Sequence, residues 1–187
     1  MRKRIIATLL LIAAMFMVNI VGVYAHTPPV TFNDELIEME AVIVDGRTLL
    51  PARDIVELLG GSIYWDEELR QVTISQPDIY IVLIIDSIEA IVNDLSVELD
   101  VPAQIINDRT KVPLRFVAEN LGVDIDFVEG TVEISAIMVW LPATGVRWHA
   151  VNDCGNMNPY RARRVTLRYA QAYDRIEGPC RICEPPQ

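Results

Sequence analysis

The stretch Asp45-Gly-Arg-Thr-Leu-Leu-Pro-Ala-Arg53 decides the fold, because it returns 62 residues later as Asn107-Asp-Arg-Thr-Lys-Val-Pro-Leu-Arg115. An Arg-Thr pair and a Pro-x-Arg element occupy the same offsets in both copies. The match continues downstream. In order, the residues Glu57, Leu59, Gly60 and Ile63 correspond to Glu119, Leu121, Gly122 and Ile125. Residues 72–75 then correspond to 132–135, after a two-residue deletion in the second copy. Two copies of one structural unit is the simplest interpretation.

Each copy predicts one short helix among strands. Pro51 and Pro113 suit the first helical position, because their φ is fixed and their missing N–H would be unpaired there. Gly60 and Gly122 can adopt the left-handed conformation that ends a helix. Alternating apolar and polar residues predict strands at 42–44, 48–50, 62–65, 71–75, 80–85, 90–92, 97–99, 111–112, 124–128 and 131–135. The predicted class is α+β: a duplicated unit of antiparallel β-strands packed on two short α-helices.

Two arginines fall in the first turn of these helices, where a cation meets the positive end of the helix dipole. Glu57 lies one turn after Arg53, and Glu119 lies one turn after Arg115. We therefore expect an intramolecular ion pair in each copy. The alternative is that the two arginines bind an anion.

The repeat resembles the copper amine oxidase N-terminal (stalk) domain family of exported bacterial proteins, over about residues 30 to 136. The Arg-Thr, Pro-x-Arg, Glu and Leu-Gly elements occur in this order in both copies. One departure is Asp54, which stands where the second copy has Phe116. The resemblance implies a stalk or adhesion-like unit of the cell envelope, which binds or spaces rather than catalyses.

Copper oxidase chemistry is not expected. In the enzymes that give the family its name, histidine ligands and a modified tyrosine lie in a separate, large catalytic domain, and this chain has only His26 and His149. A mature N-terminal His26 could chelate copper with its amine and ring, but a second histidine would have to lie nearby. We expect no copper and no enzymatic activity.

The first residues predict export. Met1-Arg-Lys-Arg4 precedes an apolar run over 5–18, and small residues then lead to a cleavage site after Ala25. The alternative is an uncleaved anchor, although the run is short for a span of roughly 20 apolar residues. No second such run follows, so we predict a signal peptide over 1–25, a duplicated domain over 26–138, a tail over 139–187 and no transmembrane span after cleavage.

Charge divides the chain at the same boundary. Residues 26–139 hold 22 acidic and 6 basic side chains, a balance that would repel nucleic acid and anionic lipid, whereas 140–187 hold 4 and 7. The tail's basic cluster lies beside Tyr160 and Tyr169 and could bind nucleic acid or an anionic wall polymer, or be an ordinary solvated face. Its members are Arg161, Arg163, Arg164 and Arg168.

The tail also carries a set of metal ligands. His149 precedes Cys154 by five positions, and Cys180 and Cys183 form a Cys-x-x-Cys element. One imidazole and three thiolates complete a tetrahedral zinc site, and 48 residues with few large aliphatic side chains need such a site for stability. We therefore predict a small zinc-ribbon-like tail with structural zinc. The alternative is a disulfide from Cys154 to Cys180 or Cys183, with one thiol left over.

The tail resembles the Ada-type metal-binding segment found at the C-termini of some exported nucleases and envelope proteins. The residues that match are Trp148-His149, Cys154, Thr166-Leu167, Ala170 and Pro179-Cys180-Arg-Ile-Cys183. With the duplicated domain, this predicts an exported, non-catalytic envelope or extracellular module whose partner is a cell-wall or extracellular polymer or protein. The alternative is an exported nucleic-acid-binding or nuclease-associated accessory protein that acts through the basic tail.

Overall fold

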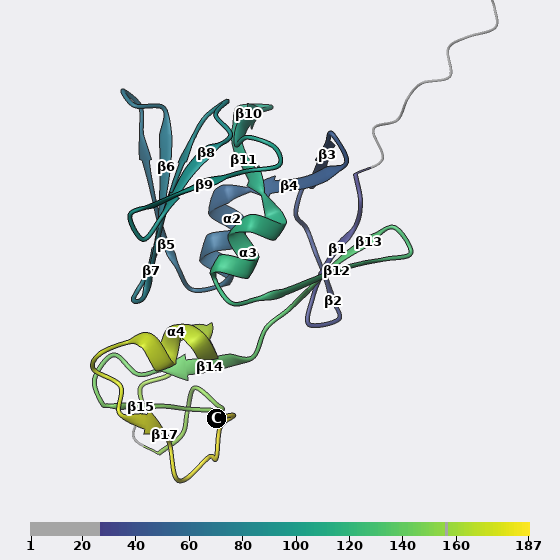
Figure 1. The fold of residues 1–187 in the computed structure, drawn as a ribbon. Coiled ribbons are helices and arrows are strands. Elements are labelled where there is room, and N and C mark those ends of the chain that lie inside the picture. The colour runs from purple at the N-terminus through teal and green to yellow at the C-terminus, as the bar shows by residue number, and fades with distance from the viewer. Residues whose placement is uncertain (1–26, 156) are drawn as a thin grey trace, which may run out of the picture.

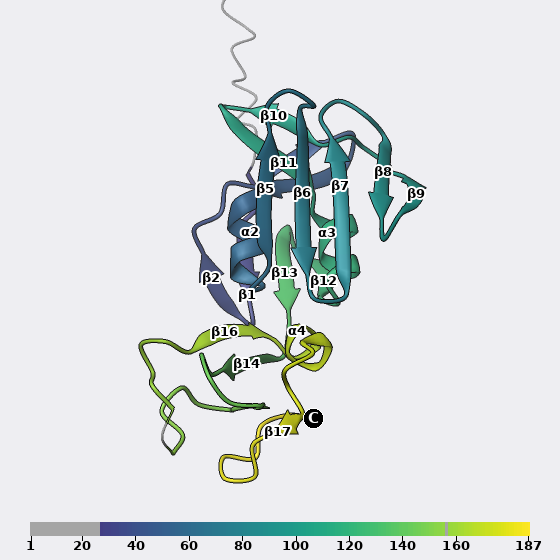
Figure 2. The ribbon, with the colours of Figure 1, turned by 90° about the vertical axis from the view of Figure 1, so that its left-hand side faces the viewer.

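The computed structural model describes residues 27–155 and 157–187, so the predicted leader and His26 lie outside it. Two short helices, α2 (Ala52–Leu58) and α3 (Leu114–Asn120), lie at the centre of the duplicated domain (Figure 1). A five-stranded sheet covers them on one side and a four-stranded sheet lies on the other. Figure 2 shows the larger sheet face-on with both helices behind it and the tail below. The predicted α+β class is confirmed.

Three sheets form the domain. The order in the central sheet is β10 (Gln104–Ile106), β11 (Arg109–Pro113), β4 (Arg47–Pro51) and β3 (Val42–Val44). The second is β12 (Asp124–Val128), β13 (Thr131–Ser135), β1 (Val30–Phe32) and β2 (Glu35–Ile37). The third is β5 (Ser62–Asp66), β6 (Gln71–Gln76), β7 (Ile79–Ile84), β8 (Glu89–Val92) and β9 (Leu95–Glu98).

The register of the central sheet confirms the duplication. Strands β4 and β11 pair antiparallel with Leu50 opposite Val112, and these two residues are each other's counterparts in the repeat. The flanking hairpins match too, because Val42 pairs with Leu49 as Gln104 pairs with Lys111. The two copies are therefore related by a local two-fold axis at the β4–β11 pair.

The helix boundaries differ from the prediction by one residue. Pro51 and Pro113 precede the helices instead of occupying the first helical position, with ψ of 121° and 111°. They remain extended because each still belongs to the β4–β11 ladder. The predicted helix ends hold: Gly60 and Gly122 have φ of +78° and +72°.

Two further hairpins, β1–β2 and β8–β9, exchange between the copies. Each turns on an Asn-Asp pair with positive φ, namely Asn33-Asp34 and Asn93-Asp94, as tight hairpins require. Hairpin β1–β2 of the first copy joins β13 of the second, and β8–β9 joins β6 of the first through β7. The β1–β13 pairing is parallel, which corrects the expectation of purely antiparallel sheets. Strand β1 comes from the other copy and no tight hairpin joins it to β13, so the two strands can run parallel.

The tail forms a separate small core. It contains β14 (Met138–Leu141) paired with β16 (Arg163–Thr166), β15 (Arg147–Trp148) paired with β17 (Gly178–Pro179), and α4 (Leu167–Ala172). Thr166 caps α4, since its hydroxyl accepts a hydrogen bond from the Tyr169 N–H at 3.2 Å. The apolar side chains of this core form a cluster distinct from that of the duplicated domain.

The tail packs on the C-terminal ends of both central helices. Val165 lies against Gly60, and a Cβ added to that glycine would meet Val165 Cγ1 at 2.7 Å. The Arg163 guanidinium donates to the Gly60 carbonyl at 3.1 Å. On the second helix, Arg168 lies over Gly122 and pairs with Asp78 at 3.4 Å. Cations at helix C-termini complement the partial negative charge there.

The charged side chain of Lys111 is fully buried. Its ammonium donates to the Glu40 carbonyl at 2.5 Å and to the Glu40 carboxylate at 3.2 Å. Hydrogen bonds from Lys111 and Asn107 lower the pKa of Glu40 from its ordinary value of 4.5. The ionised carboxylate therefore stabilises the fold.

We predict that Glu40→Gln lowers the urea midpoint at pH 7 and that this difference vanishes in acid. A depressed carboxyl pKa gives stability that is complete above the unfolded-state value and is lost as pH falls through the folded-state value. The difference between wild type and variant should shrink steadily below about pH 4.5. Glu38→Gln, at an exposed neighbour, is the control and should shift little. A difference that persists unchanged at pH 3 would contradict the ion pair.

We also predict that Gly60→Ala destabilises the protein more than Gly130→Ala does. Both glycines have positive φ, +78° and +84°, so both substitutions cost about 1–2 kcal/mol of backbone strain. A new Cβ at position 60 meets Val165, whereas Gly130 has nothing within 4 Å. Overpacking of this kind adds about 1–3 kcal/mol in urea denaturation. Equal losses would show that the tail does not rest on the helix end.

Candidate metal centre

The backbone of the tail places the ligand residues before any metal is considered. His149 and Trp140 exchange two backbone hydrogen bonds, at 2.8 and 2.9 Å. The Cys180 N–H donates to the Trp148 carbonyl at 2.9 Å, which extends the β15–β17 pairing. The Trp148 indole N–H donates to the Pro186 carbonyl at 3.0 Å. Segments far apart in sequence are thereby fixed side by side.

The four predicted ligands lie together. The side-chain donor atoms of His149, Cys154, Cys180 and Cys183 are all within 4.8 Å of one another. The Sγ atoms of Cys154 and Cys180 are 3.7 Å apart, and Cys183 Sγ lies 3.7 Å from the Nδ1 of His149. This Cys₃His cluster could hold a metal ion.

These separations fit a tetrahedral ion better than a disulfide. Sulfur ligands at about 2.3 Å from a tetrahedral centre lie about 3.8 Å apart, which is close to the spacing of Cys154 and Cys180. A disulfide would need about 2.05 Å. The three cysteines are free thiols in the structure.

The surroundings of His149 and Cys180 shift their pKa values toward the protonation states that bind a metal. Burial lowers the pKa of His149, which favours the neutral, metal-binding imidazole. Burial opposes ionisation of Cys180, but N–H groups of Cys183 and Ile182 and the neighbouring thiols outweigh it and lower its pKa. For Cys154, burial and then the hydrogen bonds and charge of Cys183 and Cys180 raise the pKa to about 12. Cys154 will therefore ionise only beside a compensating cation.

Backbone N–H groups also support the sulfur atoms. The Ala150 N–H donates to Cys183 Sγ at 3.3 Å, and the Ile182 N–H donates to Cys180 Sγ at 3.4 Å. Such bonds orient metal ligands and disperse thiolate charge. Since Cys154 and Cys180 are buried, the cluster faces inward. Four protein ligands would fill a tetrahedral ion and leave no position for a reactive water.

Two arginines of the basic cluster predicted in the tail also contact the duplicated domain. Arg163 and Arg168 reach Gly60 and Asp78, and Arg163 also stacks over Tyr169 at 5.5 Å. Arg161, Arg163 and Arg164 are exposed. Binding of a polyanion by the cluster stays a prediction.

The two helix ion pairs lie where the repeat places them. Arg53 Nη1 is 3.4 Å from Glu57 Oε1, and Arg115 Nη1 is 3.5 Å from Glu119 Oε1. All four side chains are about 60% exposed, so solvent screens each pair to about 0–1 kcal/mol.

The sequence reasoning missed a pair of cavities between the copies. Arg47 and Arg109, the arginines of the duplicated Arg-Thr element, line one cavity each. Their repetition was visible in the sequence, but their partners were not. Arg47 bonds Asp100, 53 residues away, and Arg109 bonds Asp54, 55 residues away. Only the folded two-fold arrangement brings these residues together.

Comparison with protein families gives one match: the model of the copper amine oxidase N-terminal domain covers residues 31–136. This domain is a non-catalytic accessory domain of that enzyme. No curated protein matches the chain. Across the described ranges, no helix is both long and apolar enough to cross a bilayer.

Proposed function

We propose that this chain, which belongs to the copper amine oxidase N-terminal domain family, is an exported, non-catalytic module of the cell envelope or extracellular space with a structural zinc ion in its tail. It has two parts, the duplicated domain over 26–138 and the tail over 139–187. The observation that carries the proposal is the convergence of His149, Cys154, Cys180 and Cys183 within 4.8 Å. The family match supports the structural role of the first part.

Zinc is the metal that this donor set favours. Three sulfurs and one imidazole nitrogen are soft or borderline ligands, which hard cations such as Ca²⁺ and Mg²⁺ do not select. Zinc imposes no geometry of its own and accepts the tetrahedral set. When bound, it would supply the cross-link that the small apolar cluster of the tail cannot supply by burial alone.

A structural role follows from the closed coordination. Catalysis at this metal site would need an activated water or a histidine free to act as acid or base. Of the two histidines in the chain, His149 is in the metal cluster and His26 lies outside the described residues. The module therefore acts by binding or by spacing, and its partner is an extracellular or cell-wall polymer or protein.

The nucleic-acid alternative has less support. It acts through the basic tail, yet Arg163 and Arg168 also contact the duplicated domain. The strongly acidic domain beside them would repel a polyanion. We therefore do not adopt this function.

We predict one zinc per chain by elemental analysis of protein purified without reductant. No thiol should react in the native protein, and all three should react after chelation and denaturation. Zinc stabilises the tail, so chelation should lower its unfolding temperature first. No metal, together with one disulfide and one reactive thiol, would show that the zinc proposal is wrong.

Two substitutions in the same turn distinguish the effect of losing a zinc ligand from the effect of changing a neighbouring residue. Cys183→Ser should weaken zinc binding by more than the roughly 10- to 100-fold that loss of a supporting hydrogen bond costs. Ile182→Ser is the control, because Ile182 is 79% exposed and donates only its backbone N–H. The Trp148 indole N–H resonance reports on the tail, since it bonds Pro186. It should shift in the cysteine variant and not in the control.

Export gives an independent prediction. Protein recovered from the medium or the envelope should begin at His26, as N-terminal sequencing would show. Replacing Ala25 with a bulky residue such as Tyr should slow cleavage and leave the precursor in the membrane. Full-length protein confined to the cytosol would contradict the export part of the proposal and leave the zinc part intact.

A further inference from the structure

The local two-fold axis creates two equivalent cavities of unequal size. The smaller has a volume of about 210 Å³ and the larger about 730 Å³. Every residue that lines the smaller cavity has its repeat counterpart in the wall of the larger. The smaller is lined by Pro51, Ala52, Arg53, Ile63, Trp65, Val72, Asp108, Arg109 and Thr110, whose counterparts are Pro113, Leu114, Arg115, Ile125, Phe127, Val132, Gly46, Arg47 and Thr48.

One divergent helix position changes how the duplicated arginine is paired beside each cavity. In the smaller, Arg109 reaches to the helix and bonds both carboxylate oxygens of Asp54, at 2.9 and 2.7 Å. In the larger, the counterpart of Asp54 is Phe116, which offers no acceptor. Arg47 turns instead to Asp100, at 2.7 Å. The ion pair between Arg109 and the helix carboxylate of Asp54 therefore has no equivalent beside the larger cavity.

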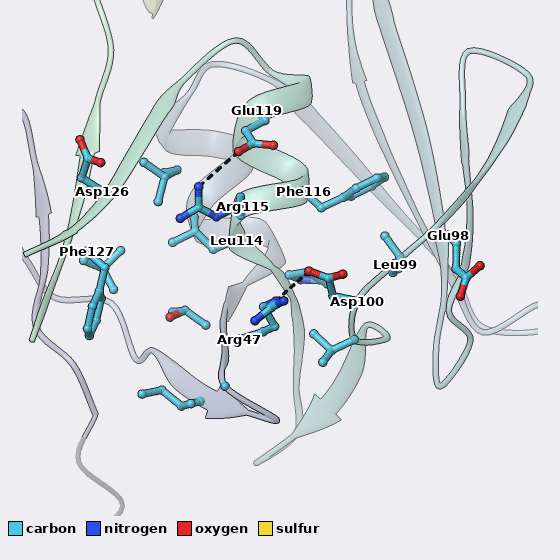
Figure 3. Close-up of a pocket in the computed structure, with 17 residues that line it drawn as sticks. Arg47, Glu98, Leu99, Asp100, Leu114, Arg115, Phe116, Glu119, Asp126 and Phe127 are labelled. Carbon is cyan, nitrogen blue, oxygen red and sulfur yellow. Dashed lines mark hydrogen bonds and ion pairs between the residues drawn. The ribbon is translucent and has the colours of Figure 1, made fainter.

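The larger cavity combines apolar walls with two neutralised ion pairs. Figure 3 shows Arg47 with Asp100 and Arg115 with Glu119 near its centre, with Phe127 on one side and Phe116 and Leu99 on the other. Its volume lies in the range of small-molecule sites. Phe127 is 57% exposed at its rim, so its ring is accessible to a ligand.

Both arginines of the cavity are neutralised by ion pairs. Two further carboxylates in its wall, Glu98 and Asp126, form no ion pair among the described residues, but both point away from the centre in Figure 3. An anionic ligand would meet two arginines already paired and a strongly acidic domain around them. A cation would meet no unpaired carboxylate at the centre. The interior therefore suits an uncharged ligand.

We propose that this cavity binds a sugar ring of a neutral glycan. A hydroxyl group donates and accepts at once, so each guanidinium–carboxylate pair offers it both kinds of partner without a charge penalty. The exposed ring of Phe127 supplies an apolar face on which a pyranose can pack. This names a partner class for the proposed module and makes no use of the zinc site.

An extended peptide is the alternative occupant. Strand recognition uses main-chain groups at an open sheet edge. Strands β4 and β13 each have a neighbour on both sides, but β3, β9 and β12, which also line the cavity, lie at the edges of their sheets. The titration below therefore includes a peptide, and its binding alone would contradict the proposal.

Calorimetric titration of the full mature chain tests the proposal. The probes are cellohexaose, chitohexaose and maltohexaose as neutral glycans, a heparin hexasaccharide as the anionic one, and an extended alanine–threonine decapeptide. We expect at least one neutral glycan to bind and Phe127→Ala to weaken it about tenfold or more. Trp65→Ala, the counterpart in the smaller cavity, is the matched control and should leave affinity unchanged.

A second variant tests the geometry directly. Phe116→Asp places beside Arg47 the helix carboxylate that pairs with Arg109 in the first copy. It should draw Arg47 away from Asp100 and abolish binding while the Trp148 indole resonance stays in place. No binding by any neutral glycan, binding unaffected by either phenylalanine variant, or binding only of heparin or the peptide would overturn the proposal. Zinc content is measured on the same samples, so failure here is distinguishable from failure of the zinc tail.

Discussion

The antiparallel pairing of β4 with β11 is the constraint on which the molecule depends. Leu50 lies opposite Val112, and Pro51 and Pro113 end their strands in this ladder, so both helices start at fixed points on either side of one axis. The glycine ends of the helices then lie where the tail can pack on them. The same axis sets Arg47 and Arg109 in matching cavities. Local geometry of one strand pair thus positions both the tail and the cavities.

Much of this fold could be predicted because its signals are local. Gly60, Gly122 and the strands 124–128 and 131–135 fall where turn chemistry and alternation place them. The exchange of hairpin β1–β2 and the parallel β1–β13 pair could not be predicted, because they depend on contacts between residues about 100 positions apart in the sequence. The Asn33-Asp34 and Asn93-Asp94 turns were nevertheless a usable signal. They place the start of β9 at Leu95, two residues before the predicted strand at 97.

The candidate metal centre and the rest of the tail were likewise predictable only in part. The metal cluster was predictable from spacing, since a Cys-x-x-Cys turn sets two ligands and the odd cysteine count requires another partner for a thiol. The role of Arg168 was not predictable, because it pairs with Asp78 of the duplicated domain, 90 residues away in the sequence. Sequence composition predicted a basic cluster, but not the contacts that two of its arginines make with the duplicated domain.

Duplication also explains how one domain can keep its fold while one cavity changes. Asp54 and Phe116 occupy the same helical position, and neither is part of the fully buried core. The carboxylate in one copy pairs with Arg109, whereas the ring in the other leaves Arg47 to pair with Asp100. Because both arginines remain paired, neither arrangement leaves an uncompensated charge. A substitution at this position therefore alters the space between the copies at little cost to stability, which is the condition for a repeat to gain a binding site.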